Sequence, residues 1–344
     1  MFISCITSCN APILIKTNNT INDNNNTANL IKLAAKNGDP YYQTILGSAY
    51  YYGDIKLEVP KDYKMAFKYL NKAAKQGNPN AQFLLAVLYY DGEGVKQNTQ
   101  TAVKYFKQAA DNGLAMAQNK MSDLYYAGEL VPKDAYKGAQ FLIKAANNDY
   151  PEAQMKLGIC YYKGECEYIE QNKKLGYDYL KKAAEKDHVK AQYSLALILH
   201  YGDKNYAESY IWLKKVAESE SKTDIEMISD AQRILGLYFM LKEPNYKEAE
   251  RWFKKSADNG NSKAQVALAL IYLDLENKEE SLRNYPEAYR YLVKAAMQGE
   301  AEAMYRLGIM YFRGLGVEKS IDISFEWMQK AAKNGHKRAQ ELIK

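Results

Sequence analysis

The sequence is poor in the residues that disulfide frameworks and metal sites require. Its 344 residues include only four cysteines and three histidines, which excludes a small scaffold held together by dense disulfides. The chain has no uninterrupted apolar run long enough to span a membrane as a helix. Neither sign of charge is in large excess, since 47 basic and 41 acidic residues leave a net charge of +6. That excess is too small by itself to indicate a nucleic-acid-binding protein.

The N-terminal segment differs from the rest of the chain. It opens with an apolar stretch, and residues 17–29 form an Asn-rich, low-complexity stretch typical of a flexible linker. No Lys or Arg occurs among the first 15 residues, although a secretory signal begins with a positive region. Residues 6–9 resemble a bacterial lipoprotein cleavage box with Cys9 as a lipid anchor, and a disordered N-terminus is the alternative. We predict a disordered or signal-like segment over residues 1–27.

From residue 28 onward one pattern recurs with a mean period near 37 residues. Each copy has a small anchor residue, a second small residue seven positions earlier, an aromatic residue four earlier, and Leu, Phe or Met three earlier. The aromatic residues are Tyr69, Tyr105, Phe141, Tyr179, Trp212, Trp252, Tyr291 and Trp327. These spacings share one face of a helix, so the pattern predicts a helix that packs through that face. In seven of the eight copies a Lys precedes the anchor, where a cation suits the end of the helix dipole.

A second helix is predicted in every copy. It carries Leu or Met, then a small residue, then an aromatic or apolar residue three positions further on, as in Leu157, Gly158 and Tyr161. Each copy is therefore a helical hairpin whose apolar faces need neighbouring copies to cover them. The sequence predicts an all-α fold over residues 28–344, an α/α superhelical solenoid of about eight hairpins with half-repeats at both ends. An insertion at residues 218–228 and a glycine-free loop at 273–284 interrupt the regular pattern.

The repeat resembles the Sel-1-like repeat, a relative of the tetratricopeptide repeat. Ala153-Gln154 with Leu157-Gly158 and Tyr161 carry the resemblance, as do the Gly-x-Gly-Val turns at residues 92–95 and 314–317. The resemblance implies a bacterial, non-catalytic scaffold or adaptor that binds a partner protein or peptide in a concave groove. Roles in envelope assembly, immunity or host interaction are also implied, without a choice among them.

Residues that could carry catalysis are few and scattered. His188, His200 and His336 lie in different repeats, without the spacing of metal ligands, and we predict no cofactor and no enzymatic activity. Ser219 and Lys222 match the S-x-x-K motif of penicillin-recognising enzymes, but no K-T-G follows. Some cysteine-rich relatives of this repeat family bind or cleave β-lactams, so a β-lactam-binding or hydrolysing enzyme is kept as an alternative.

Two further features leave alternatives open. Cys160 and Cys166 are close enough in sequence for a bridge, and cysteine-rich relatives clamp their repeats with disulfides at a different spacing. Because only one repeat here carries such a pair, we predict free, buried thiols. The recurring lysine makes a polyanion-binding solenoid another alternative, although one lysine per repeat is sparse beside 41 acidic residues.

The predicted binding surface lies on the helix that carries the Leu. Two columns of this helix, five residues after the Leu and two before it, are rich in aromatic residues that the packing pattern does not use. The candidate groove residues are Tyr51, Phe83, Tyr90, Tyr126, Tyr162, Tyr193, His200, Tyr305 and Phe312. Exposed aromatic strips are typical of protein interfaces, but both columns could instead pack between repeats. We expect a monomer that binds a protein or peptide and no nucleic acid.

Overall fold

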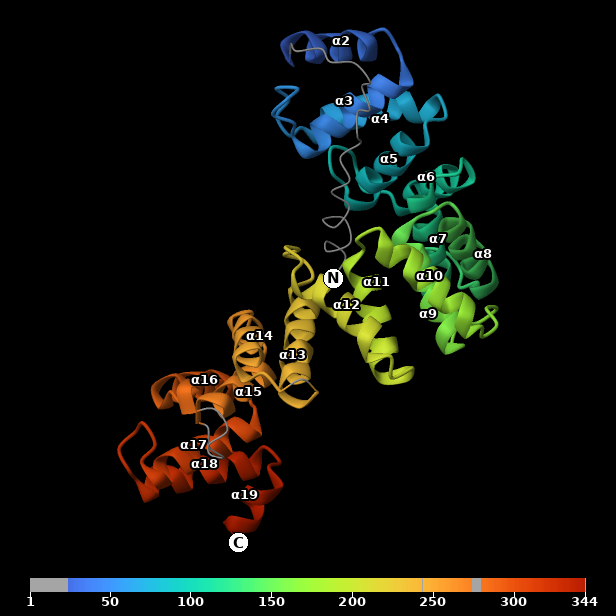
Figure 1. Ribbon diagram of the computed structural model, residues 1–344. Helices are drawn as coiled ribbons and strands as arrows, with labels where there is room; N and C mark the ends of the chain where they lie inside the picture. The colour runs from blue at the N-terminus through green and yellow to red at the C-terminus, as the bar shows by residue number, and fades with distance from the viewer. Residues whose placement is uncertain (1–23, 243, 274–279, 344) are drawn as a thin grey trace. The chain divides into compact units, whose positions relative to one another are not determined.

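Consecutive helical hairpins make up the structure. The computed structural model describes residues 24–242, 244–273 and 280–343. Figure 1 shows the helices of the N-terminal part following one another in sequence order, from α2 in blue to α10 in green. Within each part of the chain, from α2 to α10 and from α12 to α19, helices that follow one another in sequence pack together. The predicted all-α fold of repeated hairpins is confirmed.

Each hairpin has a first helix, called the A helix, and a second, called the B helix. The A helices are α3 (Pro40–Tyr52), α5 (Pro79–Asp91), α7 (Ala115–Ala127), α9 (Pro151–Lys163), α11 (Val189–Leu197), α13 (Ile225–Leu241), α15 (Ser262–Leu273) and α17 (Ala301–Arg313). The B helices are α4 (Tyr63–Lys75), α6 (Thr99–Asp111), α8 (Ala135–Asn147), α10 (Lys173–Glu185), α12 (Tyr206–Ala217), α14 (Tyr246–Asp258), α16 (Tyr285–Met297) and α18 (Ile321–Lys333). The hairpins are flanked by α2 (Asn24–Lys36) and α19 (Lys337–Leu342), and short π and 3-10 turns form at Ile198–Gly202 and Glu280–Leu282.

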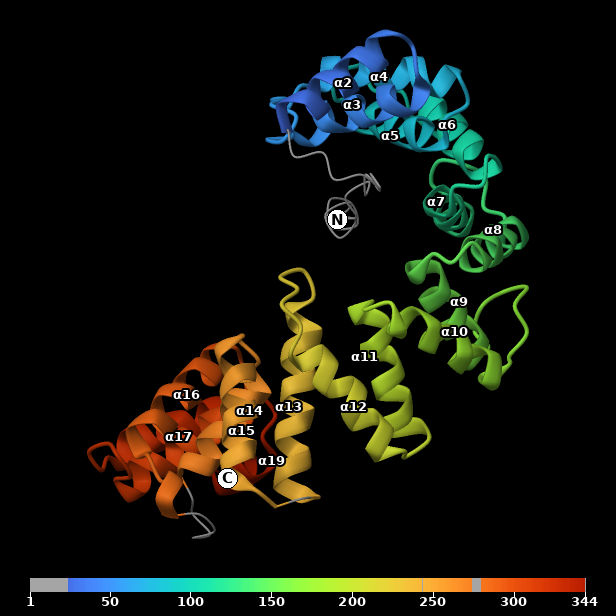
Figure 2. The same cartoon turned by 45° about the horizontal axis from the view of Figure 1, so that its top comes forward.

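The chain divides into two compact units, and the division follows Ala191 within α11. In the second unit α16 and α17 lie side by side (Figure 2). The linker predicted at residues 17–29 is wrong in its last part, because α2 already begins at Asn24. The remaining predictions for the N-terminus, including the lipid anchor at Cys9, lie outside the described residues. None of the described helices is long and apolar enough to cross a membrane.

Within a hairpin, the A and B helices meet through the residues that recur in the sequence. Gly158 of α9 lies so close to Leu180 of α10 that a Cβ atom added to the glycine would sit 2.8 Å from Leu180 Cγ. A larger residue at that position would therefore push the two helices apart. Nearby, the rings of Tyr161 and Tyr179 stack with centroids 5.9 Å apart. The same stacked pair recurs as Tyr50–Tyr69, Tyr89–Tyr105 and Tyr125–Phe141.

A buried glutamine on the A helix links successive hairpins. In α7, Gln118 Nε2 donates to the carbonyl oxygen of Ala110 in the preceding B helix at 3.1 Å. The Oε1 atom of the same side chain accepts from Asn148 Nδ2, at the end of the following B helix, at 2.8 Å. Gln43, Gln82, Gln154, Gln232 and Gln265 form the same two bonds with their neighbours. The glutamine of the A-Q-x-x-L-G motif thus connects two B helices through one A helix.

The recurring lysine covers the recurring aromatic ring of the B helix. Lys255 Nζ lies 4.6 Å from the centroid of the Trp252 ring, and Trp252 is only 3% exposed. The corresponding pairs are Lys144–Phe141, Lys182–Tyr179, Lys215–Trp212, Lys294–Tyr291 and Lys330–Trp327. A cation over an aromatic face is a favourable contact. These lysines therefore have a local partner within their own helix, which weakens the case for a polyanion-binding surface.

Candidate functional site

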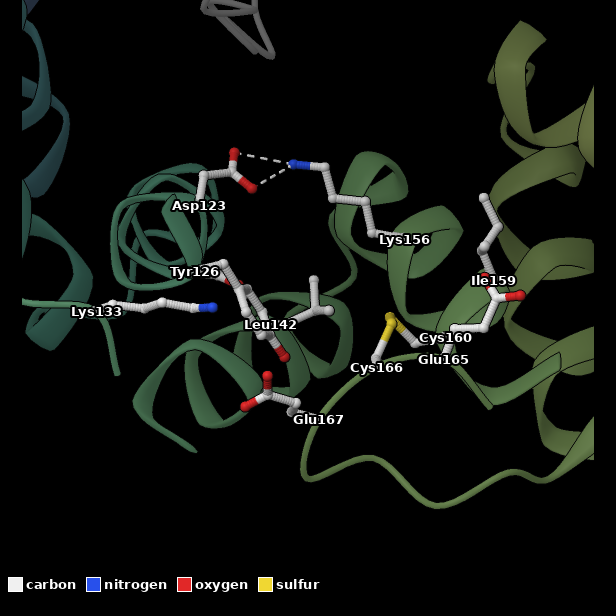
Figure 3. Close-up of a pocket in the computed structure, with 11 residues that line it drawn as sticks. Asp123, Tyr126, Lys133, Leu142, Lys156, Ile159, Cys160, Glu165, Cys166 and Glu167 are labelled. Carbon is white, nitrogen blue, oxygen red and sulfur yellow. Dashed lines mark hydrogen bonds and ion pairs between the residues drawn. A yellow bond between two sulfur atoms is a disulfide. The ribbon is translucent and has the colours of Figure 1, made fainter. Parts of the chain in front are cut away.

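An open hollow of about 440 Å³ lies on the first unit. Its walls come from α7, α8 and α9, from the loop after α7 and from the loop that joins α9 to α10. Figure 3 shows the lining side chains. They are Ser122, Asp123, Tyr126, Lys133, Leu142, Lys156, Ile159, Cys160, Glu165, Cys166 and Glu167. The hollow combines apolar walls with side chains of both charges, at the junction of two successive hairpins.

Tyr126 holds a central place in this wall. Its ring packs over Gly138 of α8, where an added Cβ atom would lie 2.9 Å from the ring. The phenolic oxygen of Tyr126 is buried and has no hydrogen-bond partner among the described residues. Burial, together with the negative charge of Glu167, raises the pKa of the Tyr126 hydroxyl, so the phenol stays protonated at neutral pH. A buried polar group without a partner costs about 1–3 kcal/mol, so the hollow contains a polar group whose bonding is incomplete.

A disulfide between Cys160 and Cys166 forms another part of the wall, with the Cα atoms 5.3 Å apart. The prediction of free thiols is therefore wrong. Gly164, which follows α9, has a φ of 71°, a left-handed conformation that glycine adopts without strain. This turn reverses the chain and brings Cys166 back to the helix that carries Cys160. The bond also ties Glu165 and Glu167, the neighbours of Cys166, to the edge of the hollow.

Lys156 of α9 reaches back to α7 at the rim of the hollow. Its Nζ lies 2.7 Å from Asp123 Oδ1 and 3.3 Å from Asn119 Oδ1. The Lys156 and Asp123 side chains are 29% and 48% exposed, so solvent screens their attraction and the pair stabilises the fold by at most about 1 kcal/mol. The main consequence of the pair is that Lys156 and Asp123 satisfy each other's charge (Figure 3).

Two of the predicted groove residues are not available to a ligand. Tyr51 is 7% exposed, and its ring centroid lies 5.5 Å from that of Tyr63. Tyr305 is 6% exposed and stacks on the His336 ring at 4.2 Å. The prediction that Tyr51 and Tyr305 lie on an exposed groove is therefore wrong, because both rings pack against neighbouring helices. The regular spacing of these two columns therefore does not distinguish buried rings from exposed ones.

The other predicted groove residues keep part of their surface exposed. Five have identified neighbours: Phe83–Phe106, Tyr90–Lys120, Tyr162–Lys173, Tyr193–Asp230 and His200–Tyr206. Phe312 is 55% exposed. Of the nine predicted residues, only Tyr126 lines the hollow.

The residues considered for catalysis are not brought together. Ser219 and Lys222 lie in the loop between α12 and α13, where the Ser219 hydroxyl accepts from the backbone N–H of Ser221 at 3.3 Å. In the described chain no hydrogen bond joins Ser219 to Lys222, whereas an activated serine needs a base within reach of its hydroxyl. Nor do the described residues contain a group of three or more His, Cys, Asp or Glu side chains arranged to hold a metal ion.

The hollow depends on residues that sequence reasoning did not single out. Glu165 and Glu167 lie in a loop that occurs in one repeat, so no recurring column marks them. The available signal was local: two cysteines flank Gly164 at the predicted end of a helix. A glycine that reverses the chain there places the second cysteine beside the first.

Stacked hairpins that share the A-Q-x-x-L-G pattern define an α-helical repeat protein. The chain belongs to the Sel1 repeat family, whose model matches residues 40–78, 79–114, 115–150, 151–188, 189–221, 229–261, 262–300 and 301–336. These eight matches confirm the family and the number of hairpins predicted from the sequence. The insertion predicted at residues 218–228 falls in part between two of the matched repeats, and its last residues begin the long helix α13.

Two solved structures extend this result. A Sel1 repeat protein from Oxalobacter formigenes is 27% identical, with a TM-score of 0.60, over 92% of this chain and 88% of that protein. A protective antigen of uropathogenic Escherichia coli with the same repeat fold is 30% identical, with a TM-score of 0.53, over 92% of this chain and 74% of that protein. Among curated protein sequences, none matches.

Proposed function

We propose that this chain is a non-catalytic scaffold that binds a partner protein or peptide through the hollow of its first unit. The observation that supports this most is the hollow itself, an open concavity with apolar walls and a few convergent polar groups, which is the usual character of a binding site. A disulfide, a close-packed ring and an interhelical ion pair hold its walls. A site that is already ordered binds with a smaller loss of conformational entropy.

Tyr90 and Tyr162 remain candidate contacts beside the hollow. They occupy the position of Tyr126 in the preceding and the following hairpins, and both are partly exposed. Tyrosine offers a large contact area together with a hydroxyl. A bound segment that crosses the hollow would meet one or both of these rings.

The test is a binding titration against the partner captured by the full chain from its source organism. Ile159→Asp places a charge in the apolar wall of the hollow, and we expect it to weaken binding at least tenfold. Ile211→Asp is the matched control, because Ile211 is 55% exposed and lies in the second unit. Equal binding by both variants would place the partner elsewhere on the chain.

The two alternatives are separated by other assays. Turnover of nitrocefin by the purified chain, abolished by Ser219→Ala, would favour the β-lactam enzyme. Binding to heparin that falls steeply with added salt would favour the polyanion binder. We expect neither result, because no hydrogen bond joins Ser219 to Lys222 in the described chain and the recurring lysines lie over aromatic rings.

A further inference from the structure

We infer that the hollow receives an arginine side chain of the bound partner, with its guanidinium placed between the Glu167 carboxylate and the Tyr126 hydroxyl. This inference rests on the proposed function and names the chemistry that the site recognises. It draws on three properties of the hollow: an unpaired carboxylate, a buried hydroxyl and apolar walls.

One carboxylate at the hollow is left without an ion pair among the described residues. Three carboxylates, Asp123, Glu165 and Glu167, line it together with two ammonium groups, Lys133 and Lys156. Lys156 forms an ion pair with Asp123, with Nζ 2.7 Å from Oδ1. Glu165 has Lys163 beside it, so the three carboxylates face three ammonium groups, and the attraction for a cationic guest rests on Glu167.

Glu167 is the carboxylate best placed to bind the guest. It makes no ion pair among the described residues, while Glu165 lies 3.9 Å from Lys163. The Glu167 side chain is exposed, so it can adjust to a ligand. Figure 3 shows its carboxylate and the Tyr126 hydroxyl directed toward each other, with Lys133 on the other side of the Tyr126 ring. An N–H donor that binds Glu167 would thus come near the buried Tyr126 hydroxyl, which lacks a partner among the described residues.

The apolar walls distinguish arginine from lysine. Leu142, Ile159, the Cys160–Cys166 disulfide and the Tyr126 ring offer apolar surface to the aliphatic stem of a long side chain. A guanidinium is weakly hydrated, stacks on aromatic faces and presents several N–H donors in one plane. It can donate to a carboxylate and to a phenolic oxygen at once, whereas an ammonium group loses more hydration on entering such a site.

The inference is tested by NMR on the full chain, with the methyl groups of Ile159 and Leu142 as reporters. The probes are capped tripeptides, Ac-Ala-X-Ala-NH2, in which X is arginine, lysine, glutamate or citrulline. Citrulline keeps the shape of arginine and removes its charge. We expect the arginine peptide to shift both methyl signals in a saturable manner, the lysine peptide to bind at least threefold more weakly, and the citrulline and glutamate peptides to leave the signals unchanged.

Variants then locate the binding. Glu167→Gln should weaken the arginine peptide at least fivefold, and Tyr126→Phe should weaken it by a smaller factor. Glu170→Gln is the matched control, because Glu170 is an exposed carboxylate of the same loop that does not line the hollow. If Glu167→Gln and Glu170→Gln weaken binding equally, the peptide is attracted by the overall charge of the loop and not by Glu167. That result would overturn the inference.

Two other outcomes also overturn the inference: equal binding of arginine and citrulline, or binding of the glutamate peptide alone. Both leave the proposed function standing if Ile159→Asp still weakens the partner. A different result would contradict the proposed function: partner binding that Ile159→Asp leaves unchanged.

Discussion

His188 Nε2 lies 3.0 Å from Glu152 Oε2, while Nδ1 of the same ring accepts the backbone N–H of Ala191 at 3.2 Å. Because Nδ1 is the acceptor, Nε2 carries the proton and donates it to the carboxylate. His336 makes the same two bonds, to Glu302 at 2.9 Å and from the N–H of Ala339 at 3.1 Å. A histidine at the start of one helix thus holds a glutamate of the previous A helix.

This relationship predicts a pH dependence of stability. Burial by itself would raise the pKa of Glu152, but the hydrogen bond from His188 and the charge of Lys156 outweigh it and lower that pKa. The folded state therefore binds fewer protons than the unfolded state near pH 4. The stabilisation is fully present above the ordinary glutamate pKa of about 4.3, and it is lost as the pH falls through the lower pKa of the folded state. We expect Glu152→Gln to lower the free energy of unfolding by about 1 kcal/mol at pH 5, and the difference from the wild type to be smaller at pH 3. Urea unfolding of both proteins at the two pH values measures it, and a difference independent of pH would contradict the assignment.

Removal of the Trp252 ring should destabilise the second unit locally. The ring is almost fully buried in the core of its hairpin and lies beneath Lys255, so Trp252→Ala should cost about 3–5 kcal/mol. Because a repeat protein is held by contacts between neighbours, loss of hydrogen-exchange protection should centre on α13 to α15. Trp252→Phe, which keeps an aromatic face, should cost less. Uniform loss of protection from end to end would argue against modular packing.

Tyr126→Phe should leave the melting temperature unchanged or raise it slightly. The variant keeps the ring over Gly138 and removes only a buried hydroxyl that has no partner among the described residues. Most substitutions of buried tyrosine are expected to destabilise, so the sign of this change is informative. The melting temperatures of Tyr126→Phe, Tyr161→Phe and the wild type are compared by thermal unfolding. A clear loss of stability would show that the Tyr126 hydroxyl has a bonding partner.

The disulfide should stabilise the first unit by a modest amount. Cys160 and Cys166 are six residues apart, and closing so short a loop contributes roughly 2 kcal/mol in the chain-entropy model. Replacing both cysteines with serine should lower the midpoint of urea unfolding, and a reductant should lower the wild-type midpoint by a similar amount. The same reductant should leave the double variant unchanged, which controls for other effects.

The sequence predicted the hairpins because the residues that pack them recur. Gly158 against Leu180 and Tyr161 against Tyr179 are copies of contacts made in several repeats, so their spacing was visible in the chain. The hollow was not predicted because it depends on one loop that occurs once. Periodicity also misled in one respect: aromatic columns that face a neighbouring helix and columns that face solvent have the same spacing, which is why Tyr51 was assigned to the groove.

The measurement that tests the central claim most directly is the hydrogen-exchange footprint of the purified partner on the full chain. If the hollow is the binding site, addition of the partner should slow exchange in residues 115–127 and 151–172, which carry α7, α9 and the disulfide-bonded loop. Residues 246–258 of α14 in the second unit, which contribute nothing to the hollow, should exchange at their original rate. Protection confined to the second unit, with residues 115–127 and 151–172 unchanged, would contradict the account.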